Sequence, residues 1–325
     1  MNRRTAFLTA TLVLASVMAS SSVAAQPYPS RTIRLLVGGA PGSVPDTLAR
    51  PIAERLSSAL GQTVVVDNRP GAAGIIAMDA MVKSAPDGYT IALATMSQAV
   101  FNNYLFSKLP YDPLRDLEPV APLVTGAMVL AAHPSFPASS LSDVAALAKA
   151  QPGRIFVAMP QNGSPPHVVA LLLNRAAGLS VTMVAHKSGT DALTAALSGN
   201  IPLIIDAPTI LSPQIAAGKL RAIAVTGSQR EPSLPNVPTV AESGFASVRG
   251  EAWIGIVAPH GTSAAIIQRL NKTLVSIMTA PEMQALMAIL GFRTLSATPE
   301  EFQARIRDDH ALWSTIIREA GIRLD

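Results

Sequence analysis

The feature that most constrains the fold of this chain is a stretch in which a strand, a glycine-proline turn and a helix follow one another. Residues 33–37 are apolar and mostly branched, which is typical of a buried strand. The following residues, 38–43, combine glycines with a proline and therefore predict a turn. Apolar residues then recur at near-helical spacing from Leu48 to Leu60 and predict an amphipathic helix. This order of elements is the repeating unit of a parallel sheet covered by helices.

The start of this helix is predicted to bind an anion. Ser43 can cap the helix, Pro45 is tolerated in its first turn, and Asp46 completes a capping-box pattern. Free backbone N–H groups at the turn and the helix start carry partial positive charge, so they attract an anion without an arginine. No Lys-Ser or Lys-Thr pair follows, and the glycines lack the dinucleotide spacing, which argues against nucleotide binding. An ordinary glycine-rich connection is the alternative interpretation.

The same order recurs in two blocks along the chain. Because 325 residues usually exceed what one hydrophobic core serves, two domains are expected. The pattern restarts near Leu123 and returns near Trp253, which predicts an α/β protein of two lobes joined by two crossover strands. Lobe 1 takes residues 26–122 and 255–325, and lobe 2 takes residues 123–254. Helices are predicted at residues 74–84, 141–150, 167–177, 191–198, 212–217, 239–243, 263–278, 281–290 and 299–320.

Residues 1–25 are predicted to be a cleaved export signal. Arg3 and Arg4 precede an apolar segment, and small residues up to Ala25 suit cleavage before Gln26. The segment is short for a membrane span, which needs roughly 20 residues; a retained N-terminal helix is the alternative. The chain has no cysteine, which excludes disulfides, thiolate metal sites and a lipid anchor on cysteine. Export without an anchor predicts the periplasm of a double-membraned bacterium.

Composition describes a globular protein that is not built for nucleic acid. Apolar residues make up 49% of the chain and charged residues 14%, and no basic run accompanies the formal charge of +4. The five histidines lack metal-ligand spacing and are expected to face solvent or to cap helices, and Trp253 and Trp313 are expected in the core. No Gly-x-Ser-x-Gly elbow or histidine–acid cluster is present, so no catalytic residue, metal or cofactor is predicted.

Further predicted strands end in polar residues, where a parallel sheet gathers its binding loops. Thr95–Gln98 ends a strand of lobe 1. In lobe 2, Asn162–His167 combines a capping serine with two prolines, and His186–Thr190 adds two hydroxyls and a lysine. Asp206 follows an apolar strand and is either an N-cap aspartate or a ligand contact.

A series of short motifs extends over nearly the whole mature chain. They are Tyr28-Pro29-Ser30, Ala40-Pro41-Gly42 with Asp46 and Ala49-Arg50, Leu60-Gly61-Gln62, Asn68–Ala72 with Gly74, Ala85–Tyr89, Leu220–Ala222 with Ala224–Thr226, Val237–Gly244, Thr298–Phe302 and Ala320–Ile322. Each motif is weak alone. Together, in this order, they make the chain resemble the periplasmic solute receptors of tripartite tricarboxylate transporters, often called Bug-type receptors.

The resemblance implies a flytrap-like receptor, similar to type II periplasmic binding proteins, that captures a small carboxylate and delivers it to membrane permease subunits. A monomer is expected, and the absence of a basic run predicts no nucleic-acid partner. Loops of lobe 1 would hold one carboxylate, largely through backbone groups and ordered water, and lobe 2 would choose the ligand. The implied residues of lobe 1 are Ala40, Pro41, Gly42, Ser43, Gly71, Ala72, Ala73, Gly74, Thr95, Met96, Ser97 and Gln98. Those of lobe 2 are Gln161, Asn162, Gly163, Ser164, His167, Lys187, Ser188, Gly189, Thr190 and Asp206.

Several positions depart from the family pattern and leave the identity of the ligand open. Ser43 stands where the family usually has a glycine, and Met159–Gln161 replaces a small, hydroxyl-rich run. Residues 185–188 replace the commoner proline-tyrosine-lysine-glycine. Lys187 is the main cation near the proposed cleft, which favours one or two carboxylates on the ligand over three. Two alternative functions remain: the chain is a ligand-sensing partner of a signalling protein, or it is an enzyme on the same scaffold.

Overall fold

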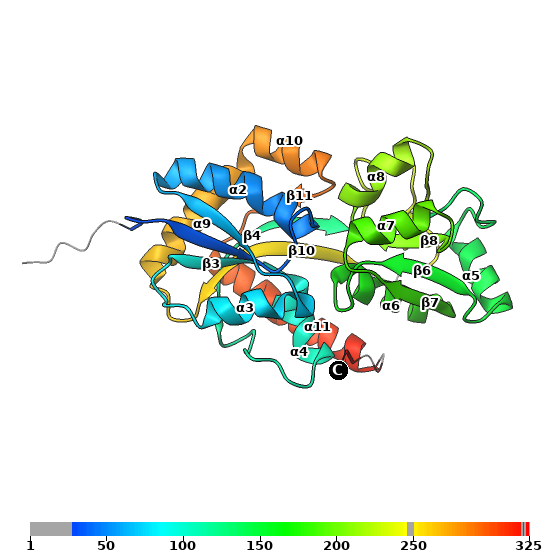
Figure 1. Ribbon diagram of the computed structural model, residues 1–325, viewed down its shortest axis with the longest axis horizontal. Coiled ribbons are helices and arrows are strands. Elements are labelled where there is room, and N and C mark those ends of the chain that lie inside the picture. The colour runs from blue at the N-terminus through cyan, green and yellow to red at the C-terminus, as the bar shows by residue number, and fades with distance from the viewer. Residues whose placement is uncertain (1–27, 246–249, 320, 322, 325) are drawn as a thin grey trace, which may run out of the picture.

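The computed structural model describes residues 28–245, 250–319, 321 and 323–324, so the predicted export signal lies outside the described residues. They form two sheets that lie side by side, as Figure 1 shows. The first sheet has six strands in the order β11 (Arg293–Thr294), β4 (Leu117–Ala127), β10 (Glu251–Pro259), β3 (Thr90–Thr95), β1 (Ile33–Val37) and β2 (Val64–Asn68). The second has five in the order β7 (Val181–Ala185), β6 (Ile155–Met159), β8 (Leu203–Asp206), β5 (Val129–Ala132) and β9 (Arg221–Val225).

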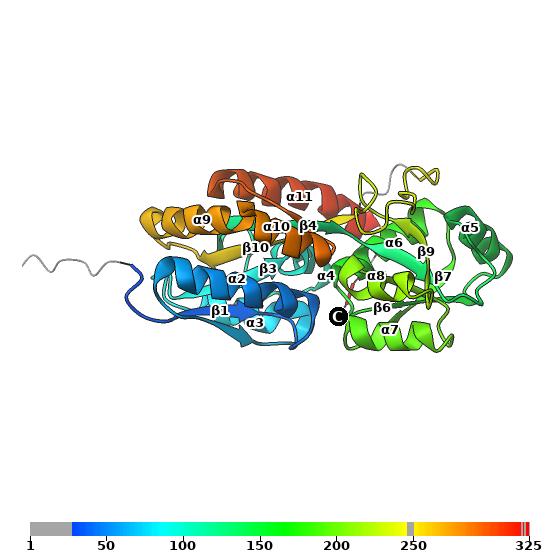
Figure 2. The same ribbon diagram turned by 90° about the horizontal axis from the view of Figure 1, so that it is seen from above.

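The first sheet is buried on both faces, which explains the apolar run in β1. Ile33 and Leu35 pack on one face, while Leu36 packs on the other. The first face is covered by α2 (Val44–Leu60), α9 (Ala264–Thr279) and α10 (Pro281–Ile289). The second is covered by α3 (Ile75–Val82), α4 (Asn102–Leu105) and α11 (Pro299–Glu319), which lie below the sheet in Figure 1. Figure 2 looks down on the molecule from the side of α2 and α10. This lobe also contains the short 3-10 helix η1 (Ala72–Gly74) and the π-helix η2 (Ser97–Phe101).

The second sheet has the same two-faced arrangement. Helices α5 (Leu141–Ala150) and α6 (Pro165–Ala176) cover one face, and α7 (Gly189–Leu197) and α8 (Pro208–Ala216) cover the other. Helices α6, α7 and α8 each begin earlier than predicted, and the prolines at the starts of α6 and α8 fit there because a first-turn proline loses no helical hydrogen bond.

The prediction of a helix at residues 239–243 is wrong. Thr239 and Glu242 exchange hydrogen bonds as in a capping box, since each backbone N–H donates to the other side chain, at 2.7 and 3.0 Å. The chain nevertheless forms only a turn, which bridges from Thr239 to Val225 and ends at Gly244.

The chain crosses between the sheets twice. Strand β4 remains in the first sheet through Ala127, and strand β10 joins it from Glu251, the residue that pairs with Ala127. The crossings therefore lie a few residues away from the predicted positions near Leu123 and Trp253, which fall inside paired strands. We accordingly define lobe 1 as the described part of the chain around the first sheet and lobe 2 as residues 128–245 with Gly250.

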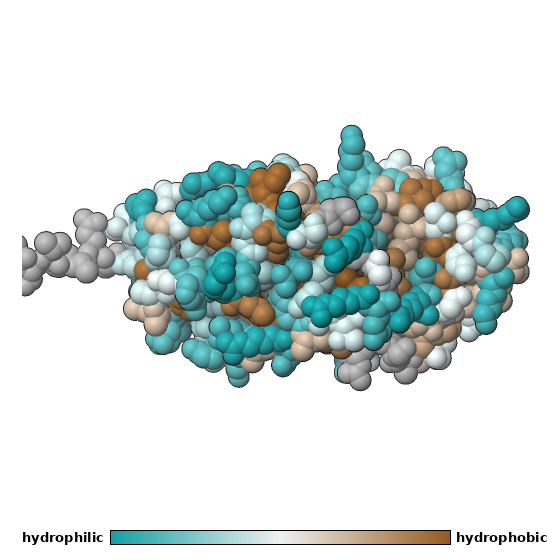
Figure 3. Space-filling model, turned by 90° about the horizontal axis from the view of Figure 1, so that it is seen from below, coloured by the Kyte–Doolittle hydropathy of each residue, from teal (hydrophilic) through white to brown (hydrophobic). Residues whose placement is uncertain are grey.

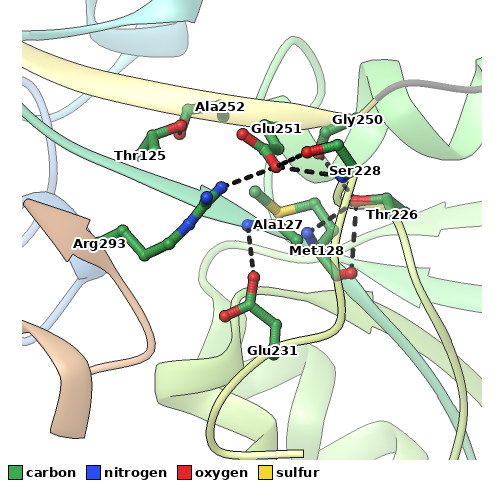
Figure 4. Close-up of polar contacts among 10 residues, drawn as sticks. All are labelled: Thr125, Ala127, Met128, Thr226, Ser228, Glu231, Gly250, Glu251, Ala252 and Arg293. Atoms are coloured by element: carbon green, nitrogen blue, oxygen red, sulfur yellow. Dashed lines mark hydrogen bonds and ion pairs between the residues drawn. The ribbon is translucent and has the colours of Figure 1, made fainter. Parts of the chain in front are cut away.

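Polar contacts fix the geometry at these crossings (Figure 4). The hydroxyl of Thr226 accepts a hydrogen bond from the N–H of Met128 at 2.8 Å and donates to the carbonyl of Gly250 at 2.8 Å. Glu251 forms an ion pair with Arg293 at 2.7 Å. The two crossing segments are thus tied to each other as well as to the sheets.

The face of the molecule in Figure 3 is mostly hydrophilic. On the face in Figure 3, hydrophobic side chains gather only in small, separate patches over both lobes. No helix in the described part of the chain is long and apolar enough to cross a membrane.

Candidate ligand-binding site

A cavity of about 460 Å³ lies between the lobes and is lined by residues of both. Four helices start at its wall: residues from the first turns of α2, α6, α7 and α8 all face it. The first N–H groups of a helix have no intrahelical partner and carry partial positive charge. The volume is typical of a site for a small organic molecule.

The structure brings most of the implied site residues to this cavity. Those that line it are Ala40, Pro41, Gly42, Ser43, Ala73, Gly74, Thr95, Ser97, Gln98, Gln161, Ser164, Lys187, Ser188, Gly189, Thr190 and Asp206. Those that do not are Gly71, Ala72, Met96, Asn162, Gly163 and His167.

The residues outside the lining support the loops that form it. Met96 is 1% exposed and packs in the core. Ala72 adopts a positive φ of 46° in the turn before Ala73. His167 accepts the N–H of Gly163 on Nδ1 at 3.0 Å, and burial lowers the pKa of His167 to about 4, so the ring is neutral.

The turn before α2 differs from the predicted capping box. Ser43 occupies the N-cap, but its hydroxyl forms no capping bond and has no partner at all. The carboxylate of Asp46 instead accepts the N–H of Gly42 at 2.8 Å, and the N–H of Ser43 donates to the carbonyl of Ala40 at 3.0 Å. The prediction of free N–H groups is therefore wrong for Gly42 and Ser43. Those of Val44 and Asp46, in the first helical turn, remain without an intrahelical acceptor.

Asp46 is the anchor of this turn. It is 2% exposed and accepts hydrogen bonds from Arg50 at 2.8 Å and from Asn68 at 3.0 Å. Burial by itself raises the pKa of Asp46, but the bonds from Arg50, Gly42 and Asn68 hold it below its usual value. Because Asn68 also donates to the carbonyl of Gly39 at 2.9 Å, the end of β2 is connected to the turn that follows β1.

Gln98 joins the other two loops of lobe 1. Its Nε2 donates to the carbonyl of Ala73 at 2.9 Å, and its Oε1 accepts the N–H of Thr95 at 2.7 Å. A Cβ on Gly74 would lie 2.0 Å from this Nε2, so only glycine fits there. Both ends of the Gln98 amide are thus used to shape the cavity wall.

The lobe 2 loops are held by capping bonds. Ser164 caps α6 by accepting the N–H of His167, and Ser188 caps α7 by accepting the N–H of Asp191 at 3.1 Å. Gln161 donates to the carbonyl of Lys187 at 3.0 Å. The side chain of Lys187 is exposed at the cavity rim and forms no ion pair with a described residue.

Asp206 is the most buried charged residue of the cavity wall. It ends β8 and is 3% exposed, and its Oδ1 accepts the N–H of Ala207 at 2.7 Å. Its Oδ2 is buried without a hydrogen-bond partner, and burial raises the pKa of Asp206 to about 7. The N-cap interpretation is wrong, because Ala207 occupies the N-cap of α8 and no side chain caps that helix.

Sequence reasoning missed the apolar part of the wall, to which Trp253, Phe292, Ile210 and Met128 contribute. Trp253 is buried, as predicted for a core residue, and donates to Asp309 at 2.6 Å, yet it also borders the cavity. No local signal marks these residues, since they come from separate elements that only the tertiary fold brings together.

The expectation for the histidines is wrong at two positions, His167 and His310, which are both buried. Nε2 of His310 lies 2.7 Å from the carbonyl of Ala99, and its Nδ1 lies 2.8 Å from the hydroxyl of Tyr104. This histidine therefore joins α11 to the segment behind the cavity. Among the described residues, no group of three or more histidines and acids could hold a metal ion.

Hydrogen bonds join the lobes at two places beside the cavity, and an ion pair of 3.3 Å between Arg175 of α6 and Glu319 of α11 joins them as well. The hydroxyl of Ser97 donates to the carbonyl of Gly163 at 2.7 Å. The hydroxyl of Thr209, at the start of α8, donates to the carbonyl of Leu290 at the end of α10. The structure therefore represents a form in which the lobes are closed on one another.

Comparison with known proteins identifies the kind of protein that has this arrangement. A family model described as the tripartite tricarboxylate transporter family receptor matches residues 48–322. The chain belongs to this family. Protein BugT of Bordetella pertussis is 33% identical to it over 314 residues, which cover 96% of each chain.

Solved structures of members of this receptor family share the fold. Periplasmic binding protein BugD is 31% identical, with a TM-score of 0.83 over 91% of this chain and 100% of that one. R. palustris Rpa4515, solved with adipate, is 30% identical, with a TM-score of 0.86 over 91% of this chain and 100% of that one. The predicted two-lobed fold of a Bug-type periplasmic binding protein is confirmed.

Proposed function

We propose that this receptor captures a small organic carboxylate between its lobes in the periplasm and delivers it to the permease of a tripartite tricarboxylate transporter. The observation that carries the proposal is the cavity at which four helices begin. At the starts of α2, α7 and α8, N–H groups without a helical acceptor and aligned peptide dipoles favour an anion. Helix α6 adds only its dipole, because Pro165 and Pro166 have no N–H and the N–H of His167 donates to Ser164. Lys187 is the one cation among the described lining residues.

The composition of the wall suggests what the rest of the ligand looks like. Trp253, Phe292 and Ile210 give the cavity an apolar side, where a hydrocarbon portion of the ligand can be buried. A carboxylate with a short apolar body fits such a wall better than a densely charged tricarboxylate. Adipate, the acid in the Rpa4515 structure, has this character and is a sensible first probe.

Titration calorimetry on the purified mature protein tests the binding step. Adipate, malate, citrate, glutamate and benzoate form a suitable panel, together with mass spectrometry of any acid that co-purifies. We expect at least one acid to bind in the micromolar range or tighter. Absence of heat and of thermal shift with every acid would overturn the proposal.

The delivery step is tested in cells. Deletion of the gene should abolish uptake of the captured acid, and the intact gene should restore it. Uptake that is unchanged in the deletion strain would contradict delivery and favour a sensing role. The receptor purified from the same cells can be sequenced from its N-terminus, and we expect the mature chain to begin at Gln26.

A further inference from the structure

Two residues that line the cavity, one from each lobe, each carry a buried side-chain oxygen without a hydrogen-bond partner. These oxygens are Oγ of Ser43 and Oδ2 of Asp206. A buried polar atom without a partner costs free energy, which a ligand can recover by supplying the missing bond. The two atoms therefore mark where a bound molecule makes its side-chain contacts.

Building on the proposed function, we propose that Asp206 binds the ligand as a neutral carboxylic acid and donates a hydrogen bond from Oδ2 to an oxygen at the lobe 2 end of the ligand. Capture then requires the protonated form of Asp206. When Asp206 is ionised in the free protein, it takes up one proton from the solvent as the ligand binds.

The hydrogen bonding of Asp206 determines which oxygen carries the proton. Oδ1 already accepts the N–H of Ala207, so Oδ2 is the oxygen that is free to be a hydroxyl. Gly189 packs directly against it, since a Cβ at Gly189 would lie 2.3 Å from Oδ2. The hydroxyl is thus confined to the cavity wall and has the ligand as its available acceptor.

The charged groups around Asp206 do not stabilise its ionised form. Lys187 and Asp191 line the same cavity from the β7–α7 connection and the start of α7, but both are exposed and neither forms a hydrogen bond with Asp206. The neighbouring strand β5 and the following helix α8 contain no charged residue. The ring of His186 is turned to the carbonyl of Val184 at 3.0 Å. Burial therefore decides the protonation of Asp206, and it raises the pKa to about 7.

The same chemistry selects the ligand. An ionised Asp206 would repel a second carboxylate and attract an ammonium group, whereas a neutral Asp206 donates to a carboxylate, carbonyl or ether oxygen. The inferred ligand class is a carboxylate that carries a second oxygen acceptor at its far end. Amino acids that would place their ammonium group against Asp206 are disfavoured.

Calorimetry of the wild-type protein with adipate and malate, between about pH 6.5 and about 8.5, provides the test because both acids stay ionised in this window. We expect the affinity to fall by about 25-fold across it, because the neutral fraction of Asp206 falls by about that factor between the two ends of this window. Repeating the titration in buffers of different ionisation enthalpy should reveal the uptake of nearly one proton per ligand at the high pH. Affinity that is constant or rises with pH would overturn the inference while leaving the proposed function intact.

Two substitutions separate the hydrogen bond from the shape of the site. Asp206→Asn keeps a donor that cannot ionise, so we expect binding close to that of the wild type at low pH and no pH dependence. Asp206→Leu removes the donor and should bind at least tenfold more weakly than the wild type at low pH, again without pH dependence. If Asp206→Asn binds as poorly as Asp206→Leu while its fold is intact by circular dichroism, the inference fails.

Glu231 supplies the matched control. It is a second acid whose pKa is raised by burial, and it accepts the N–H of Ala127 at 3.3 Å outside the cavity (Figure 4). Glu231→Gln should retain the pH dependence and the proton uptake. Loss of either in this variant would contradict the assignment to Asp206. If none of the panel acids binds at any pH, both the proposed function and this inference are overturned.

Discussion

Ser43 lies at the N-cap of α2, yet its hydroxyl bonds to nothing within the protein. Asp46 has taken over the stabilisation of the turn through the N–H of Gly42, so the serine is not needed for that purpose. Replacing an N-cap serine by alanine usually lowers stability, but here the hydroxyl of Ser43 makes no capping bond and is available for a ligand.

We expect Ser43→Ala to weaken ligand binding by about five- to tenfold, because one neutral hydrogen bond contributes roughly 1 kcal/mol. The free energy of unfolding should stay unchanged, since no bond of the free protein is lost. Calorimetry and urea denaturation measure the two quantities.

Ser140→Ala is the control for this prediction. Ser140 caps α5 through a complete capping box with Asp143, far from the cavity lining. Its removal should cost about 1 kcal/mol of stability and leave ligand affinity unchanged. Equal loss of stability in both variants would show that Ser43 is structural.

At the scale of elements, local signals predicted helices better than they predicted the long strands. Helix α5 begins and ends at the predicted residues because Ser140 and Asp143 encode its start in adjacent positions. Strand β4 was missed as a unit, since Pro119 and Pro122 interrupt its apolar pattern and its pairing partner β10 lies far along the chain.

Of the candidate site, too, one part could be predicted from local sequence and the other could not. Turns such as Ala40–Ser43 and Ser188–Thr190 follow strands and could be recognised from their residues. The apolar wall could not, because Trp253 and Phe292 reach the cavity only through the order of strands in the first sheet. The protonation of Asp206 also depends on burial, which no local pattern reports.

The contact between α8 and α10 yields a prediction about closure. Thr209 bonds to the carbonyl of Leu290 across the lobes but does not line the cavity. Thr209→Val should destabilise the closed form by roughly 1 kcal/mol and weaken ligand binding up to about tenfold without altering the site. Calorimetry together with small-angle scattering of the free protein measures both effects, and the free variant should be more extended.

Thr273→Val provides the comparison, because Thr273 bonds to Arg269 within the exposed part of α9. It should leave affinity and dimensions unchanged. An identical response of the two valine variants would exclude a role of the α8–α10 contact in closure.

At the scale of the whole molecule, buried acids make stability depend on pH. Burial raises the pKa of Asp206 to about 7, and it also raises those of Glu231 and Asp309. An acid with a higher pKa in the folded state binds more protons there than in the unfolded chain. The contribution of Asp206 to the stability of the fold is therefore fully present below pH 3.8, the pKa of an aspartate in the unfolded chain. This contribution is lost as the pH rises toward 7, the pKa of Asp206 in the folded protein.

Asp206→Asn should remove most of this loss. Above pH 7 we expect the variant to be more stable than the wild type by roughly 4 kcal/mol, and near pH 4 the two should be similar. Denaturation over a pH series measures the difference. Asp87→Asn, in an exposed pair with Arg31, should change stability by less than about 0.5 kcal/mol at any pH. A parallel offset of Asp206→Asn at all pH values would contradict the assignment.

The position of β10 between β3 and β4 has a consequence for the order in which the protein can be completed. During synthesis, β3 and β4 emerge from the ribosome well before β10 (Glu251–Pro259). Until β10 is made, the edges of β3 and β4 that will pair with it have unpaired backbone donors and acceptors. Lobe 2 is one continuous segment and can finish first. A nascent or truncated chain that lacks β10 is therefore the species most exposed to aggregation and most in need of a chaperone.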